Sequence, residues 1–89
     1  MRSKKYSELF AKKLNKLKGQ ELENIINKMK ELVEASDINH YKNLKYDLKK
    51  FKRIHVNKSF VILFFCENNT IYFIDYEHHD KIYKKVYTF

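Results

Sequence analysis

The chain has 89 residues, 44% of them hydrophobic, with seven phenylalanines, seven tyrosines and no proline. That content excludes a disordered tail and suits one domain, residues 1–89, with a modest core. The 19 Lys and Arg residues exceed the 11 Asp and Glu residues, so the net charge is +8. This charge favours a polyanionic partner, with nucleic acid first and a membrane surface second, although a solvated lysine-rich surface would give the same count.

Three further features narrow the class of protein. The single cysteine, Cys66, excludes an internal disulfide and a cysteine-based zinc site, and its apolar neighbours indicate a packed thiol. The N-terminus has no apolar signal segment. No stretch approaches the roughly 20 apolar residues of a membrane span. We therefore expect a cytoplasmic protein with no membrane partner.

The first half of the chain predicts two helices. Residues 1–6 form either a frayed end or a short first strand. From Ser7, a suitable N-cap, apolar residues keep helical spacing to Leu17, and Gly19 falls where this helix would stop. A second helix is expected over residues 20–35, with an apolar stripe at i, i+3, i+4 and i+7. The short link between them predicts an antiparallel helical hairpin.

The second half predicts three strands, after a segment (36–50) that is either a partial helix or a loop. Residues 52–57 alternate between basic and apolar side chains, and residues 60–66, apolar on both faces, should form the central strand. A third strand is expected over residues 70–76. Turns at Asn57–Lys58 and Asn68–Asn69 would join them as antiparallel neighbours. The fold class is therefore α+β, a helical hairpin packed on a small antiparallel β-sheet.

Two segments resemble motifs of the RelE/ParE toxin superfamily. RIHVNKSFVILF (residues 53–64) resembles its R-I-R-V-G-x-Y-R-hydrophobic strand pair, and YEHHDKIYK (residues 76–84) resembles its V-G-H-R-x-x-V-Y-R terminal motif. Residues 42–54 fit the preceding family segment loosely. The resemblance implies a RelE-like toxin of a type II toxin–antitoxin system. Such a toxin is a ribosome-dependent mRNA endoribonuclease that inhibits translation, and a cognate antitoxin neutralises it.

The motifs also imply roles for individual residues. Arg53 matches the first basic strand residue of the family, and His55 takes the place of the second. His78 matches the histidine of the terminal motif, and Tyr83 matches its tyrosine. His79 stands where the terminal motif has an arginine.

Further departures from the family pattern fall in both motifs. Phe60 stands where the family has the arginine that acts on the scissile phosphate, and both family glycines are replaced, by Asn57 and Glu77. Phe60 cannot stabilise a phosphorane as arginine would. The alternative is therefore a catalytically impaired RelE-fold module that binds RNA or an antitoxin. A ParE-like inhibitor of DNA gyrase, which needs no nuclease residues, is a third hypothesis.

Cleavage of RNA by its own 2′-hydroxyl needs a base, an acid and cations near the phosphate, but no metal or cofactor. Histidine can serve as base or acid because its unperturbed pKa is about 6.5. The predicted catalytic residues are Arg53, His55, His79 and Tyr83. We prefer His79 to His78 because adjacent residues of an extended strand diverge, and this divergence also argues against a metal site there.

A basic run precedes and enters the first long strand. It would neutralise phosphates without reading their sequence. The predicted RNA-binding residues are Lys49, Lys50, Lys52, Lys58 and His78. The expected partners are mRNA, the ribosome through its rRNA, and an antitoxin whose acidic segment would meet the same charge. An exposed apolar groove between the helices would indicate a further partner surface.

Overall fold

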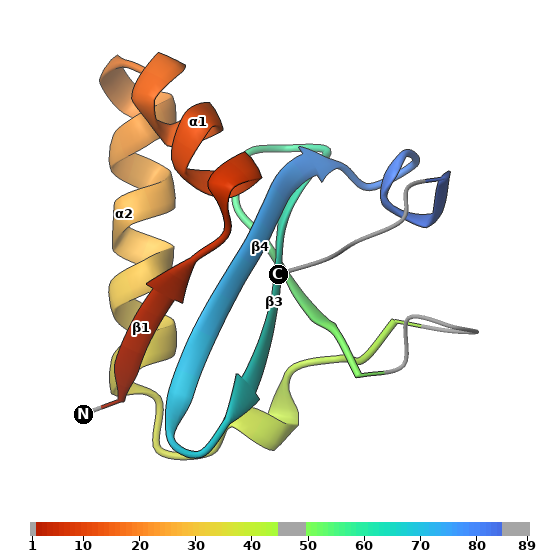
Figure 1. The fold of residues 1–89 in the computed structure, drawn as a ribbon. Coiled ribbons are helices and arrows are strands. Elements are labelled where there is room, and N and C mark those ends of the chain that lie inside the picture. Colours follow the sequence, from red (N-terminus) through yellow and green to blue (C-terminus); the bar gives the residue numbers. More distant parts are fainter. Residues whose placement is uncertain (1, 45–49, 85–89) are drawn as a thin grey trace.

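The structure of the chain is a computed structural model that describes residues 2–44 and 50–84 (Figure 1). It contains a four-stranded sheet, two α-helices and short 3-10 helices. In chain order the elements are β1 (Ser3–Tyr6), α1 (Glu8–Lys16), α2 (Gly19–Glu34), η1 (Ile38–His40), β2 (Lys52–His55), β3 (Phe60–Glu67), β4 (Thr70–His78) and η3 (Ile82–Lys84).

The sheet is mixed, with the strand order β1-β4-β3-β2. β2, β3 and β4 form the predicted antiparallel meander. Residues 3–6 form the short first strand that was one of two alternatives, and β1 pairs with β4 in parallel. The expectation of a wholly antiparallel sheet was therefore wrong. A parallel pair needs a long connection between its strands, and the helices and meander supply it.

Ser7 joins the start of α1 to the edge of β4. Its side-chain oxygen accepts a hydrogen bond from the backbone N–H of Phe10 (3.0 Å), which confirms the predicted N-cap. The same hydroxyl donates to the carbonyl of Ile74 at 2.5 Å, and the Ser7 N–H donates to that of Phe73 at 2.9 Å. Gly19 has φ +63° and begins α2, so the break between the helices falls where the glycine predicted it.

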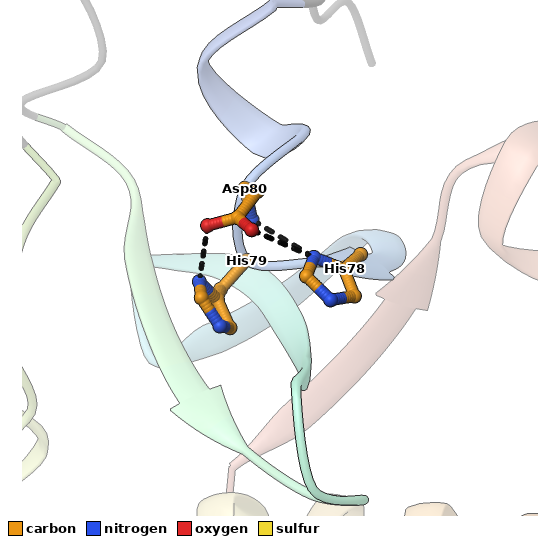
Figure 2. A group of neighbouring side chains, drawn as sticks. All are labelled: His78, His79 and Asp80. Carbon is orange, nitrogen blue, oxygen red and sulfur yellow. Dashed lines mark hydrogen bonds and ion pairs between the residues drawn. The ribbon is translucent and has the colours of Figure 1, made fainter.

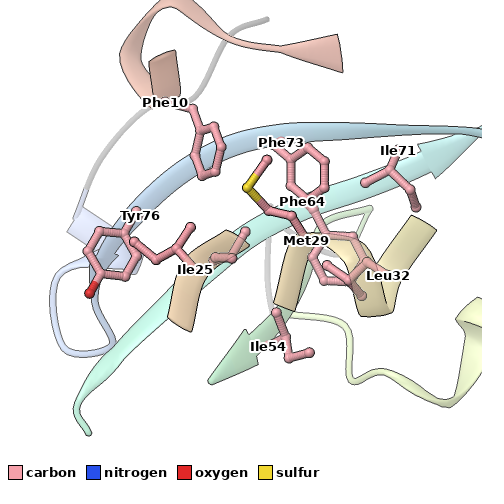
Figure 3. Close-up of a cluster of buried hydrophobic side chains, with 10 residues drawn as sticks. Phe10, Ile25, Met29, Leu32, Ile54, Phe64, Ile71, Phe73 and Tyr76 are labelled. Carbon is pink, nitrogen blue, oxygen red and sulfur yellow. The ribbon is translucent and has the colours of Figure 1, made fainter. Parts of the chain in front are cut away.

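Both faces of the sheet carry a buried cluster. On one face, α1 and α2 pack against the strands (Figures 1 and 3). This cluster contains Phe10, Ile25, Met29, Leu32, Ile54, Ile62, Phe64, Ile71, Phe73 and Tyr76. The opposite face carries Leu44, Phe51, Val61, Leu63, Ile74 and Ile82. β3 contributes to both clusters, as its run of apolar residues predicted.

The turns confirm the predicted meander. Asn68 and Asn69 have φ of 52° and 59°, the left-handed conformation that asparagine tolerates, and they connect the paired residues Glu67 and Thr70. Lys58, with φ 39°, lies in the loop between β2 and β3. Within the described residues, no helix combines the length and the apolar character that crossing a membrane requires.

Candidate functional site

A row of five rings curves around the end of the sheet where β4 stops. Tyr76 stacks on Phe60 (centroids 5.1 Å apart), and Phe60 meets His78 edge-on at 5.6 Å. His78 stacks on His79 at 4.7 Å, and His79 lies 6.3 Å from His55 of β2. The sheet thus brings together three of the four histidines of the chain, from β2 and from the end of β4.

A turn immediately after β4 sets the positions of His78 and His79. The N–H of His79 donates to the carbonyl of Ser59 (2.8 Å), and the N–H of Lys81 donates to that of His78 (2.9 Å). Because the extended chain ends at His78, the two rings do not diverge. This corrects the expectation that only one of them could face a shared site.

Both imidazoles face Asp80 (Figure 2). Nδ1 of His79 lies 2.9 Å from one carboxylate oxygen of Asp80, and Nδ1 of His78 lies 3.7 Å from the other. The backbone N–H of Asp80 also donates to Nδ1 of His78 at 3.2 Å. When the neutral His79 ring carries its proton on Nδ1 and donates a hydrogen bond to Asp80, its Nε2 has the lone pair that a general base uses.

Arg53 and His55 lie on the same side of β2. Ile54, between them, is buried against the helices, so alternation along the strand directs Arg53 and His55 to the opposite face. In the register of the sheet they pair with Leu63 and Val61, which belong to the cluster on that face. Arg53 is half-buried and His55 is exposed.

Of the described lysines that were predicted to bind RNA, Lys58 lines a pocket together with His78, whereas Lys50 and Lys52 make contacts elsewhere. Lys52 contacts the segment before β2, where its Nζ donates to the Asn43 side chain (2.8 Å). Lys50 lies over the ring of Phe65, 5.4 Å from its centroid, five positions along β3 from Phe60. Lys58 is exposed in the loop between β2 and β3.

Two predicted residues are described in part or not at all. Tyr83 belongs to η3, which follows the turn at His79, and its side chain lies outside the described part of the chain. Lys49 lies outside the described residues altogether.

A polar network that the sequence did not predict lies beside the ring row. The hydroxyl of Tyr76 donates to Glu21 (2.7 Å) and accepts from the Asn57 side-chain amide (2.9 Å), while Asn24 donates to Asn57 at 2.7 Å. Burial, together with the hydrogen bond to Glu21, raises the pKa of Tyr76 from 10.0 to about 12. Glu21 and Asn24 share a helix face, but only the fold places that face opposite Asn57.

Glu21, Asn24 and Asn57 of this network line an open pocket of about 650 Å³ that also includes Phe60 and His78. On the far edge of the sheet, a second hollow of about 510 Å³ lies between β1 and the helices. We call it the β1–α2 groove. It is lined by Lys4, Tyr6, Leu14, Leu22, Ile26, Met29, Lys30, Val33 and Glu34. Tyr6 and Ile26 are each 40% exposed there, so an apolar groove is present, although it lies between β1 and the helices and not between the two helices alone.

No family model matches the chain. A chain of the intact E. coli RelBE toxin–antitoxin complex shares its fold with a TM-score of 0.71, covering 88% of this chain and 96% of that chain at 16% identity. YafQ from E. coli strain BL21(DE3) gives a TM-score of 0.73, covering 93% and 99%, also at 16% identity. The architecture is therefore the α+β fold of RelE-like proteins.

Sequence similarity goes further. A protein of Methanocaldococcus jannaschii named "Putative toxin RelE4" is 45% identical over 75 residues, which cover 82% of this chain and 78% of the relative. The chain belongs to the RelE/ParE toxin superfamily, which confirms the resemblance seen in its two motifs.

Proposed function

We propose that the chain is the toxin of a type II toxin–antitoxin system, a metal-free and ribosome-dependent mRNA endoribonuclease that inhibits translation. The observation that carries this proposal is the arrangement of His79, oriented by Asp80, with its ring 6.3 Å from that of His55. Two imidazoles on either side of one phosphodiester can supply the base and the acid that RNA self-cleavage needs. Superfamily membership supports the toxin assignment.

In this proposal, His79 is the base because Asp80 holds its Nδ1 proton and leaves Nε2 with a lone pair. Nε2 takes the proton of the 2′-hydroxyl, and the 2′-oxygen then attacks phosphorus. The bond from phosphorus to the 5′-oxygen breaks, which leaves a 2′,3′-cyclic phosphate. His55, in its protonated form, gives its proton to the departing 5′-oxygen. Arg53 and Lys58 offset the charge that develops on the phosphorane, and Tyr83 contacts the phosphate or a base.

Phe60 supports the alternative of a binding module. It stacks on Tyr76 and packs against the helix-side cluster, so the position that carries arginine in the family here contributes to packing. A protein with this change would hold RNA or an antitoxin without cutting. The gyrase inhibitor remains a third alternative, and a supercoiling assay would identify it.

The proposed partner is a cognate antitoxin, and the β1–α2 groove is our candidate surface for it. Its walls are apolar, and Lys4 and Lys30 also line it, so it suits an amphipathic segment with acidic residues beside the apolar ones. Ile26→Glu should weaken the complex because it places a charge among these apolar side chains. The same variant should keep its toxicity, since β1 and β2 are opposite edges of the sheet.

The experiment that tests the nuclease is induced expression followed by primer extension on a reporter mRNA. Wild type should arrest growth and give cuts phased with codons. His79→Ala and Arg53→Ala should each reduce cleavage at least about 100-fold. His40→Ala is the matched control: it removes the fourth histidine, which lies in η1 at the other end of the sheet (Figure 1).

Two results would decide against this proposal. Wild type that is folded and soluble but causes neither arrest nor cuts would favour the binding module. Cleavage that persists in His79→Ala would remove the assigned base. Phased cuts that disappear on omission of ribosomes from a purified translation system would support ribosome dependence.

A further inference from the structure

We propose that His78, His79 and Asp80 form a binding site for a divalent transition-metal ion. The ligand atoms of these three residues lie within 4.8 Å of one another. The carboxylate stands between the two rings (Figure 2), at 2.9 Å from one Nδ1 and 3.7 Å from the other. The expectation that no metal binds here assumed that the two histidines diverge, and their rings instead stack.

The separations suit a metal with short bonds. Zinc binds imidazole nitrogen and carboxylate oxygen at about 2.0–2.2 Å in tetrahedral geometry, so two ligands on one ion lie about 3.4 Å apart. The 2.9 Å and 3.7 Å separations lie on either side of that value. The side chains of His78, His79 and Asp80 are 32%, 40% and 71% exposed, so small rotations can close the remaining distance.

The backbone at the site is constrained by contacts that a bound ion would leave in place. Hydrogen bonds from His79 to Ser59 and from Lys81 to His78 hold the turn. One contact would be exchanged, because Nδ1 of His78 now accepts from the N–H of Asp80. The remaining coordination position would be taken by water, as in open zinc sites.

The donor set predicts which ions bind. Two imidazoles with one carboxylate favour Zn²⁺, Ni²⁺ or Cu²⁺, which accept nitrogen ligands. Mg²⁺ and Ca²⁺ prefer a shell of oxygens, and here a single carboxylate faces the rings. The net charge of +8 also disfavours an ion held by charge alone. We therefore expect selectivity for Zn²⁺ over Mg²⁺.

A bound ion would have a consequence that rests on the proposed nuclease. Coordination through Nδ1 of His79 moves the proton of the neutral ring to Nε2, the nitrogen assigned as the base. Zn²⁺ should therefore inhibit cleavage of RNA by the full chain. The binding itself needs neither RNA nor a ribosome, so it can be measured separately.

The test is calorimetric titration of the purified full chain with ZnCl₂ or MgCl₂ in the absence of RNA. We expect one Zn²⁺ per chain and no saturable Mg²⁺ binding. Loss of outer-shell partners weakens metal sites about 10–100-fold, so loss of a ligand in His79→Ala or Asp80→Asn should weaken binding at least about tenfold. Co²⁺ absorption gives a second readout, and circular dichroism checks that each variant is folded. His40→Ala should bind as wild type does.

Two results would overturn the site. One is the absence of saturable Zn²⁺ binding with a Kd below about 1 mM. The other is binding that His40→Ala removes and that His79→Ala and Asp80→Asn leave unchanged. If Zn²⁺ binds as expected but the wild type cuts no RNA, the metal site stands and the nuclease proposal fails.

Discussion

The ammonium group of Lys13 lies 2.6 Å from a carboxylate oxygen of Asp75, whose side chain has no exposed surface. The same Nζ donates to the backbone carbonyl of Tyr76 at 2.8 Å. β1 pairs with β4 only along residues 70–73, so α1 takes over this edge where β1 ends. Lys13 therefore joins α1 to the part of β4 that leads into the histidine turn, the turn after β4 that positions His78 and His79.

Replacing Lys13 by methionine should destabilise the fold. The substitution keeps most of the aliphatic length but removes the ammonium group that lies 2.6 Å from the buried carboxylate of Asp75. Removing one member of a buried pair costs about 3–5 kcal/mol, and Lys13 is partly exposed, so we expect about 3 kcal/mol. Urea unfolding measures this change. Lys28→Met is the control, because its ion pair with Glu31 is exposed. A loss no larger than that of the control would contradict the role given to Lys13.

Stability should fall in alkali through Tyr76. Its pKa is 10.0 in the unfolded chain and about 12 in the folded protein, because burial and Glu21 favour the protonated form. The native state then retains a proton that the unfolded state has lost. The contribution of Tyr76 to the free energy of unfolding is therefore complete below pH 10 and is lost as the pH rises towards 12.

Tyr76→Phe should remove this part of the pH dependence. It should also cost about 1 kcal/mol at neutral pH, because the hydrogen bonds to Glu21 and Asn57 are lost. Urea unfolding at about pH 9 and about pH 11 compares the variant with wild type. Tyr41→Phe is informative as well, since burial and Glu31 raise the pKa of Tyr41 to about 12. If Tyr76→Phe and wild type lose stability in parallel, the assignment to Tyr76 is wrong.

The stability of the protein should depend on which small residue occupies the turn at Asn68 and Asn69. Both residues have positive φ, which glycine adopts without strain and alanine adopts at a cost. Asn69→Ala should lower the free energy of unfolding by about 1 kcal/mol, and Asn69→Gly should leave it unchanged or raise it slightly. Thermal unfolding of the two variants checks this order. Equal stability would show that the turn relaxes to another conformation.

Phe60→Arg should increase cleavage by the proposed nuclease. The new guanidinium would lie beside His78 and could stabilise charge on the phosphate, an effect worth about tenfold or more. Loss of stacking on Tyr76 should cost about 1 kcal/mol of stability. Phe60→Leu removes the same ring without adding a cation, so equal cleavage by both variants would argue against a charge effect.

The sequence predicted features whose cause is local. Ser7 caps α1, and Asn68–Asn69 forms a turn, because each depends on the conformational preference of a few adjacent residues. The apolar run of β3 was enough to place it between two buried layers. Residues 3–6 were ambiguous, because the partner that makes them a strand lies at residues 70–73.

The site was predictable only in part. Alternation along β2 placed Arg53 and His55 together, but nothing local indicated that β4 ends at His78 and lets two adjacent rings face Asp80. Lys52 also shows that basic residues adjacent in the sequence need not act at the same site. It is adjacent to Arg53 in sequence, yet its ammonium is held by Asn43.

The pairing of Ser3 with Thr70 places the first strand in the sheet beside one of the last to be made. During synthesis, residues 3–6 therefore have no strand partner until β4 has left the ribosome, and the helices lack the part of their packing face that β4 supplies. Long-range pairing of this kind is slow and forms late. The histidine turn follows β4 in the chain, so a truncated product lacks both the completed sheet and the turn. The emerging chain therefore cannot assemble the turn at His78 and His79 until most of it has been translated.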